Sequence, residues 1–441
     1  MTFSMLSLRP RLSLVFSLLF TFSLASGVQA QHRGEGSIYS RFGIGELRTY
    51  VSSQGQGLGG GGLALGSSNY LNTGNPASFS DQFFTRLSAG MLYENLSAAE
   101  ASQKTSRLVS SSLNALHASF PLLSNRLGVG LAFTPYSRVN FNVQTEGRLT
   151  SDASVQDSAS YLVNFRGNGG LQRITTGLGY RLHPNVSVGA SAEFIFGILE
   201  EQQETRFISS AYVPSLITKA TRMFGVTATL GVRASLPRVF TKEDAMAIGV
   251  ALTLPTTLDA TRVQTLGEAL APDTLGGEID GTASLPLGFS AGVAYQTGSK
   301  LTMVLDARYE PWSGFESSFS FPGYDPNAPT VFKDRTRLSG GVEFFPAGRD
   351  LSASYFKRVA YRLGVYIDQS YSSPNPGVDI NTMALTGGFS FPTLLAGTRI
   401  DINMEVGRRG TTDQNLIRDT FYKLGFNLNF GERWFNQRKL R

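Results

Sequence analysis

The chain has 441 residues, a formal net charge of +6 and no cysteine. The lack of thiols excludes a disulfide framework and cysteine chemistry. Its 48 glycines and 31 phenylalanines, in a sequence that is only 41% hydrophobic, are typical of a β-barrel rather than of a helical fold.

Residues 1–30 have the layout of a secretory signal peptide. Arg9 and Arg11 precede an apolar run over Leu12–Leu24, and Val28-Gln29-Ala30 offers small residues for cleavage. The apolar run is shorter than the roughly 20 residues that a membrane-spanning helix needs. We therefore expect cleavage after Ala30 and export across the inner membrane.

Residues 31–80 are rich in glycine and poor in charge, and they end where alternating strands begin. We expect this segment to form a plug, or hatch, in the lumen of a barrel. The residues that mark it are Gly59, Gly60, Gly61 and Gly62, followed by Asn75, Pro76 and Ala77. Glycine permits close packing and a shift of the plug when a ligand arrives. The glycine run lacks the Lys-Ser or Lys-Thr of a phosphate-binding loop, and Asn-Pro is also an ordinary start of a turn.

Period-two alternation dominates from residue 81 to residue 430. Over Thr398–Arg408, for example, the apolar residues Ile400 and Ile402 alternate with Asp401 and Asn403. Charged residues on the face that also carries glycine and threonine indicate a polar lumen and an apolar exterior. The pattern predicts an all-β fold, a transmembrane antiparallel β-barrel of about fourteen strands. We expect these strands to be centred near Ala89, Asn114, Leu131, Leu178, Ala192, Ala228, Gly249, Ala291, Leu305, Gly341, Leu363, Gly387, Asn403 and Phe426.

The predicted connections alternate between short and long, as in outer-membrane barrels with short periplasmic turns and long extracellular loops. The short ones are expected at 121–126, 183–185, 237–244 and 297–300. The long ones are expected at 144–170, 200–219, 266–284 and 312–332. An even strand number then places both ends of the barrel on the periplasmic side.

Two features of this barrel suggest a path for an apolar ligand. Pro135 lies within the third strand, where it has no N–H for the ladder and predicts a kink or gap; the alternative is that it simply ends a short strand. An apolar cluster on the loop between strands five and six would be a landing site for a ligand, or it packs the loop against its neighbours. The cluster consists of Ile208, Tyr212, Val213, Leu216 and Ile217.

The last strand contains a pattern of polar, glycine, apolar and aromatic residues: Lys423, Gly425, Leu428 and Phe430. It resembles the C-terminal signal that the barrel-assembly machinery reads, although eleven residues follow the aromatic residue. Residues 431–441 are expected to form a basic periplasmic tail, which either contacts anionic lipid or is simply solvated.

Catalysis is not indicated. The chain has three histidines, His32, His117 and His183, and none has a serine and a carboxylate at a spacing that builds a triad. No paired histidines or cysteines stand at metal-ligand spacing, so we expect no enzyme activity, no metal and no cofactor. No basic stripe interleaved with stacking aromatics is present either, so we expect no nucleic-acid partner.

The chain resembles the FadL-type family of outer-membrane transporters for long-chain fatty acids and other hydrophobic compounds, in particular its Bacteroidetes-like branch. Tyr39-Ser40-Arg41-Phe42-Gly43, Asn75-Pro76-Ala77 and the count of about fourteen strands carry this resemblance. It implies a luminal hatch, ligand capture by extracellular loops, an apolar internal pocket and a lateral exit at a kink in the third strand.

The resulting hypothesis is a passive uptake channel in the Gram-negative outer membrane. Its partners would be hydrophobic small molecules such as fatty acids, outer-membrane lipid and the barrel-assembly machinery. The alternative is a FadL-fold protein that binds other proteins, as a secretion-system shuttle or another outer-membrane component. An apolar inner path would favour uptake, whereas a blocked interior with a large extracellular platform would favour protein binding.

Overall fold

A computed structural model describes residues 36–100, 105–149, 159–208, 213–267, 273–328, 332–348, 350, 352–374, 378–395 and 397–432. The predicted signal peptide at 1–30, Tyr212 and most of the predicted tail at 431–441 lie outside the described residues. None of the described helices is long and apolar enough to cross a membrane.

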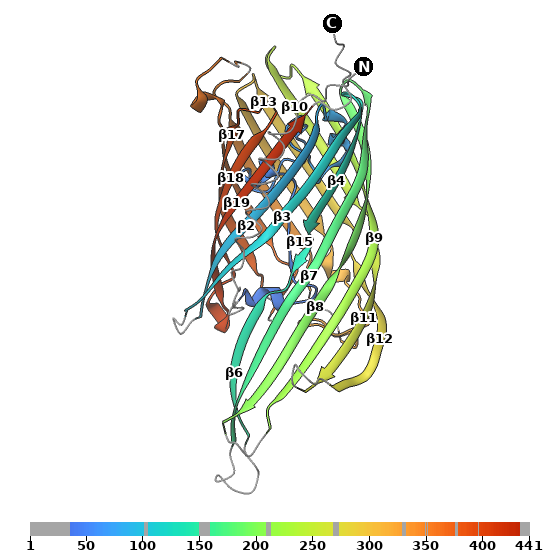
Figure 1. Ribbon diagram of the computed structural model, residues 1–441, viewed down its shortest axis with the longest axis vertical. Helices are drawn as coiled ribbons and strands as arrows, with labels where there is room; N and C mark the ends of the chain where they lie inside the picture. Colours follow the sequence, from blue (N-terminus) through green and yellow to red (C-terminus); the bar gives the residue numbers. More distant parts are fainter. Residues whose placement is uncertain are drawn as a thin grey trace, which may run out of the picture. The chain divides into compact units, whose positions relative to one another are not determined.

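The chain is dominated by antiparallel strands (Figure 1). The strands are β1 (Glu46–Leu47), β2 (Thr85–Ala99), β3 (Thr105–Leu123), β4 (Leu127–Pro135), β5 (Ser137–Arg138), β6 (Phe141–Leu149), β7 (Ala159–His183), β8 (Val186–Phe207), β9 (Ser215–Pro237), β10 (Asp244–Thr253), β11 (Thr256–Leu266), β12 (Asp273–Leu285), β13 (Gly288–Thr297), β14 (Leu301–Glu310), β15 (Arg335–Phe344), β16 (Ala360–Gln369), β17 (Asn381–Pro392), β18 (Arg399–Arg409) and β19 (Arg418–Glu432). The short helices are η1 (Ile38–Arg41), α2 (Ser53–Gln56), η2 (Pro76–Asp81), η4 (Trp312–Gly314), η5 (Tyr355–Arg358) and η6 (Asp413–Asn415).

The strands other than β1 and β5 close into one barrel. Three of its strands are interrupted, as β4 with β6, β10 with β11 and β12 with β13, so the wall contains fourteen strands. Pairing of β19 with β2, from Arg418 opposite Ala99 to Glu432 opposite Thr85, completes the closure. The fold class predicted from the sequence is confirmed, and each of the fourteen expected centres lies in a different wall strand.

Alternation in the sequence becomes alternation across the wall. On β19, Phe426 and Leu428 are 48% and 38% exposed, whereas Asn427 and Asn429, which alternate with them, are buried in the lumen. A strand that separates lipid from a polar interior must place apolar and polar residues on opposite faces. The expectation of a polar lumen and an apolar outer surface is therefore met.

The wall divides at the end of the barrel that is remote from Thr85 and Glu432. Six strands, in the order β6, β7, β8, β9, β11 and β12, continue beyond the others as a protruding sheet, which we call the lip (Figure 1). Among the described residues, no pairing joins β6 to β3 or β12 to β14. The barrel is thus continuous at one end and split by two seams at the other.

The seam beside β12 is filled by the connection between β14 and β15. Ser317 forms a bridge with Ala283, and the Ser318 N–H donates to the Thr282 carbonyl at 2.8 Å. Behind this contact lies an aromatic cluster at the far end of the lumen, composed of Trp312, Phe315, Phe319, Phe321, Phe332 and Tyr371. Its rings pack against one another, with Trp312 stacked on Tyr371 at a ring distance of 4.7 Å.

Three of the predicted long loops are wrong in extent. Most of 144–170, 200–219 and 266–284 belongs to the strands of the lip. Both faces of these strand ends carry polar residues because they extend past the apolar belt, and the alternation that identifies a membrane strand is lost there. The expected connection at 312–332 is a true loop.

Candidate functional site

The N-terminal segment of residues 36–84, which we call the inner segment, lies inside the barrel (Figure 1). It contains η1, β1, α2 and η2 and contacts strands on every side of the lumen. β1 pairs with β5, the short strand in the interruption of the third wall strand, with Glu46 opposite Arg138 and Leu47 opposite Ser137. The inner segment is therefore attached to the interruption that Pro135 begins.

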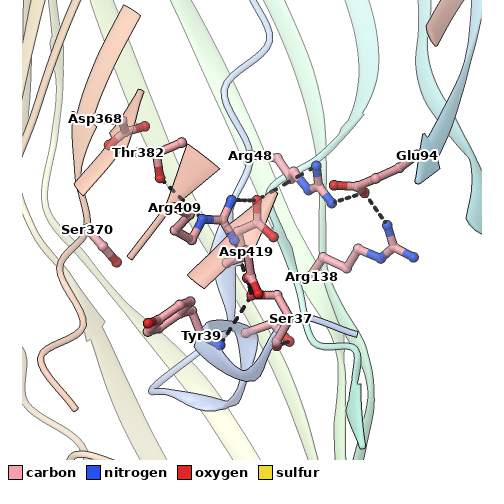
Figure 2. A network of polar contacts seen from close by, with 12 residues as sticks. Ser37, Tyr39, Arg48, Glu94, Arg138, Asp368, Ser370, Thr382, Arg409 and Asp419 are labelled. Carbon is pink, nitrogen blue, oxygen red and sulfur yellow. Dashed lines mark hydrogen bonds and ion pairs between the residues drawn. The ribbon is translucent and has the colours of Figure 1, made fainter. Parts of the chain in front are cut away.

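Ion pairs fix β1 and the adjacent Arg48 to two strands of the wall, β18 and β2. Arg409 on β18 donates to Glu46 at 2.5 Å, and Arg48 donates to Glu94 on β2 at 3.1 Å. Arg138 on β5 donates to the same Glu94 oxygen at 3.0 Å. Figure 2 shows this network, in which Glu94 joins two guanidinium groups. Charge-assisted bonds of this kind are about twice as strong as neutral ones.

Hydroxyl groups of η1 and its cap complete this attachment. Ser37 donates to the carboxylate of Asp419 (Figure 2). Tyr39 donates to the carbonyl of Ile417. Burial, followed by the negative charge of Asp419, raises the pKa of Tyr39 to about 12. The phenol therefore stays protonated and remains a hydrogen-bond donor at physiological pH.

The glycine run after α2 binds the wall through its backbone. The N–H groups of Gly62 and Leu63 donate to the two carboxylate oxygens of Asp306 at 2.6 and 2.9 Å. The Gly59 N–H donates to the hydroxyl of Thr386 at 2.8 Å. Gly59, Gly60 and Gly62 have φ of +74°, +77° and +102°, a left-handed conformation in which glycine is strongly favoured. These bonds satisfy a buried carboxylate and hold the segment to β14 and β17.

Glycines of the wall make room for the inner segment. A Cβ on Gly341 would lie 2.7 Å from the Cα of Leu58, and a Cβ on Gly364 would lie 2.3 Å from the backbone nitrogen of Gly59. Sequence reasoning identified the glycines of the plug but missed these partners. Glycine inside an alternating strand signals a close backbone approach, and it is the signal that would have found them.

The Asn75-Pro76-Ala77 triplet starts η2 and also lies against the wall. The Asn75 side chain accepts a hydrogen bond from the Ala77 N–H at 3.1 Å and donates to the Val232 carbonyl at 3.1 Å. A Cβ on Gly189 would lie 2.3 Å from the carbonyl carbon of Pro76. The triplet is thus both a helix cap and a contact with β8 and β9.

A cavity of about 470 Å³ lies between β1 and the wall. Pro135 and the outward-facing Leu113 line it, so it reaches the wall at the third-strand interruption. Most of its other lining residues are polar. The charged residues that line it are Glu46, Arg48, Arg138, Arg335, Arg337, Asp368, Glu405, Arg409 and Lys423. Its surface is nevertheless about equally polar and apolar, so it offers contacts to both kinds of group.

The histidine considered for catalysis, His117, lies on β3 among packed side chains. His117 is buried and packs edge-on against Tyr50 at a ring distance of 5.2 Å, while Ser119 donates to Gln82. No group of three or more potential metal ligands occurs among the described residues. His117 therefore has a packing contact and no catalytic partner there.

The other predicted site residues lie apart from the inner segment. Ile208 and Val213 are 74% and 83% exposed at the tip of the lip, whereas Leu216 and Ile217 belong to β9 and not to a loop. On β19, Lys423 and Gly425 face the lumen, and Lys423 donates to Glu405 at 3.0 Å. Leu428 and Phe430 of the same pattern face outward.

Comparison with known proteins gives one family and a set of similar folds. A family model described as BamG matches residues 13–441. The toluene transporter TbuX of Ralstonia pickettii has a TM-score of 0.55 at 14% identity, over 86% of this chain and 98% of its own. The toluene transporter TodX of P. putida has a TM-score of 0.53 at 13% identity, over 88% and 99%. A Pseudomonas aeruginosa FadL homologue has a TM-score of 0.52 at 13% identity, over 87% and 98%. Curated proteins include no match. At this identity the likeness concerns the fold.

Proposed function

This chain belongs to the BamG family, and from that premise we propose that it is a protein-binding component of the outer membrane that works with the barrel-assembly machinery. Its barrel has the fold of FadL-type outer-membrane channels. The protein would use this fold as a membrane-anchored scaffold. In this function it binds other proteins and performs no chemistry.

The observation that carries this proposal is the fixed, filled interior. The inner segment is bonded to β2, β14, β15, β17, β18 and β19. The aromatic cluster packs together at the far end of the lumen. A route for an apolar solute needs a continuous apolar lining, and the cavity of about 470 Å³ has nine charged side chains in its lining.

The lip supplies the second support. Its six strands stand beyond the apolar belt on one side of the barrel (Figure 1). On the outward face of β8, apolar residues extend to Ile198 and are followed by Glu200, Gln202, Glu204 and Arg206. An ordered polar sheet of this kind offers a platform for a protein on the extracellular side.

Affinity purification of the tagged chain from detergent-solubilised outer membranes tests this function. We expect the central barrel of the assembly machinery to co-purify in near-stoichiometric amount after gentle crosslinking. A matched variant in which residues 204–216 are replaced by Asn-Gly, between the paired residues Gln203 and Ile217, should fold as a barrel but lose the partner. Recovery of the wild-type chain without it contradicts the proposal, and recovery of a secreted protein instead supports the shuttle function.

A second candidate is uptake of small hydrophobic molecules such as fatty acids. One observation favours it: the cavity of about 470 Å³ reaches Pro135 and Leu113, where the third wall strand is interrupted. In this function, residues Gly59–Gly62 and Asn75–Ala77 would move as a gate, Ile208 and Val213 would make the first contact with ligand, and Pro135 would mark a lateral exit.

Mass spectrometry of small molecules extracted from the detergent-purified protein tests uptake. Enrichment of long-chain hydrophobic molecules over a detergent blank would support it, and an empty protein would count against it. Gly60→Val and Gly61→Val should reduce uptake without loss of the barrel, because their Cβ atoms would lie 2.7 Å from Arg337 and 2.4 Å from Asp306.

A further inference from the structure

A second cavity, of about 210 Å³, lies at the far end of the lumen between the lip and the aromatic cluster. We call it the mouth cavity. Its lining includes Arg41 of η1, Phe141 of β6, Phe165 and Arg166 of β7, Glu201 of β8, Lys219 of β9 and Phe321 of the β14–β15 loop. It is separate from the cavity at Pro135, with which it shares no lining residue.

The mouth cavity has an excess of positive charge. Arg41 and Lys219 line it, and Arg262 packs over Phe321 beside it with its guanidinium 4.9 Å from the ring centre. Glu201 is the carboxylate that lines it, directly opposite Lys219 in the register of β8 and β9. None of the three cations forms an ion pair with a described carboxylate, whereas Arg335, Arg362 and Arg409 deeper in the lumen each do.

Aromatic rings hold two of these cations in place. The guanidinium of Arg41 lies 4.8 Å from the ring centre of Phe165 and 5.9 Å from that of Phe141. Arg262 lies 4.5 Å from the ring centre of Phe319 and donates to the Ser320 carbonyl at 3.0 Å. Cation–π contacts of this kind order a charge without neutralising it. The cavity thus combines preoriented cations with exposed ring surface.

A partly enclosed site with uncompensated positive charge favours an anion, because burial penalises unpaired charges of one sign. Ring surface beside the cations favours an apolar body attached to that anion. The volume is below the roughly 300–1,000 Å³ of pockets for drug-sized ligands. We propose that the mouth cavity binds a small carboxylate or phosphate that carries an aromatic or short aliphatic group. This binding site is independent of the partner binding proposed above.

Isothermal titration of the folded protein in a non-ionic detergent tests the site with benzoate and phenyl phosphate, and with toluene as the uncharged comparison. We expect saturable binding of both anions, at least tenfold stronger than any binding of toluene, and weaker at high salt. Arg41→Gln and Lys219→Gln should each weaken binding of the anions at least fivefold. The control, Arg206→Gln, removes an exposed cation of β8 that does not line the cavity and should leave binding unchanged.

Glu201→Gln should change the affinity for anions in the opposite direction. A variant that merely misfolded would lose affinity, so this result distinguishes the two cases. Removing this carboxylate leaves the cations in place, so anion binding should strengthen at least threefold. Equal affinity for benzoate and toluene, absence of saturable binding, or weaker binding by Glu201→Gln would each overturn the proposal. Displacement of phenyl phosphate by diphosphoryl lipid A would assign the anion to the surrounding membrane and overturn the small-molecule ligand. Failure of lipid A to compete would support it.

Discussion

Arg362 shows how single residues hold the inner segment and the wall together. It donates to Glu343 at 2.6 Å, to Asp401 at 3.3 Å and to the hydroxyl of Tyr70 at 2.8 Å. Its side chain is 1% exposed and that of Asp401 is 0% exposed. Solvent screening is therefore small, and the loss of one partner leaves a buried charge without its neutralising neighbour.

Arg362→Met should lower the free energy of unfolding by about 3–5 kcal/mol, the cost of breaking a buried ion pair on one side. Unfolding by guanidinium chloride in detergent, monitored by tryptophan fluorescence, measures this free energy of unfolding. Arg206→Met is the control, because its side chain is 66% exposed beside Glu204 and exposed pairs contribute about 0–1 kcal/mol. Equal effects of the two substitutions would contradict this account of the lumen.

Two adjacent glycines of β15 face opposite sides of the wall, so substitutions at the two positions distinguish packing within the wall from packing against the inner segment. A Cβ on Gly341 would lie 2.7 Å from Leu58, whereas the nearest atom to a Cβ on the outward Gly340 is 3.5 Å away. Gly341→Val should destabilise the protein by about 1–3 kcal/mol through overpacking and expose the inner segment. Gly340→Val should do neither. Hydrogen exchange of residues 53–63 gives the readout, and equal protection in both variants would show that the segment does not depend on this contact.

At the scale of elements, sequence alternation located the membrane-spanning strands because lipid and lumen impose opposite polarity on neighbouring residues. The same rule failed at the strand ends of the lip, such as Glu200–Phe207 of β8, where water reaches both faces. The contacts of the inner segment were also beyond prediction. The partner of Asp306 is a pair of backbone N–H groups about 240 residues away in sequence, and backbone donors leave no side-chain signature.

The pairing of β1 with β5 gives a prediction that separates the two candidate functions. The chain has no cysteine, so Leu47→Cys with Ser137→Cys introduces one unambiguous disulfide between residues that face each other in register. Antiparallel partners have Cα atoms about 4.5–5.5 Å apart, within the reach of a disulfide. Oxidation should leave partner co-purification unchanged but stop any uptake that requires the inner segment to move. Loss of the partner on oxidation, reversed by reduction, would show that this segment moves when the partner binds.

At the scale of the whole molecule, the barrel is continuous at one end and split at the other. Closure depends on β3 with β4 and on β13 with β14, pairings that lie outside the lip. Replacement of residues 204–216 by Asn-Gly should therefore preserve the heat-resistant, faster-migrating band of a folded barrel in gel electrophoresis. Loss of that band would show that the lip contributes to closure as well as to its surface.

The lip stands on one side of the rim only, between β6 and β12 (Figure 1). A barrel with an even rim presents the same profile to neighbours from every direction in the plane of the membrane. In this barrel the lip makes one side of the rim different from the others. A partner that binds the lip must lie at one angular position around the barrel axis, and the opposite side of the barrel stays in contact with lipid. Assemblies built on this protein should thus have one such partner per barrel and a fixed rotational order.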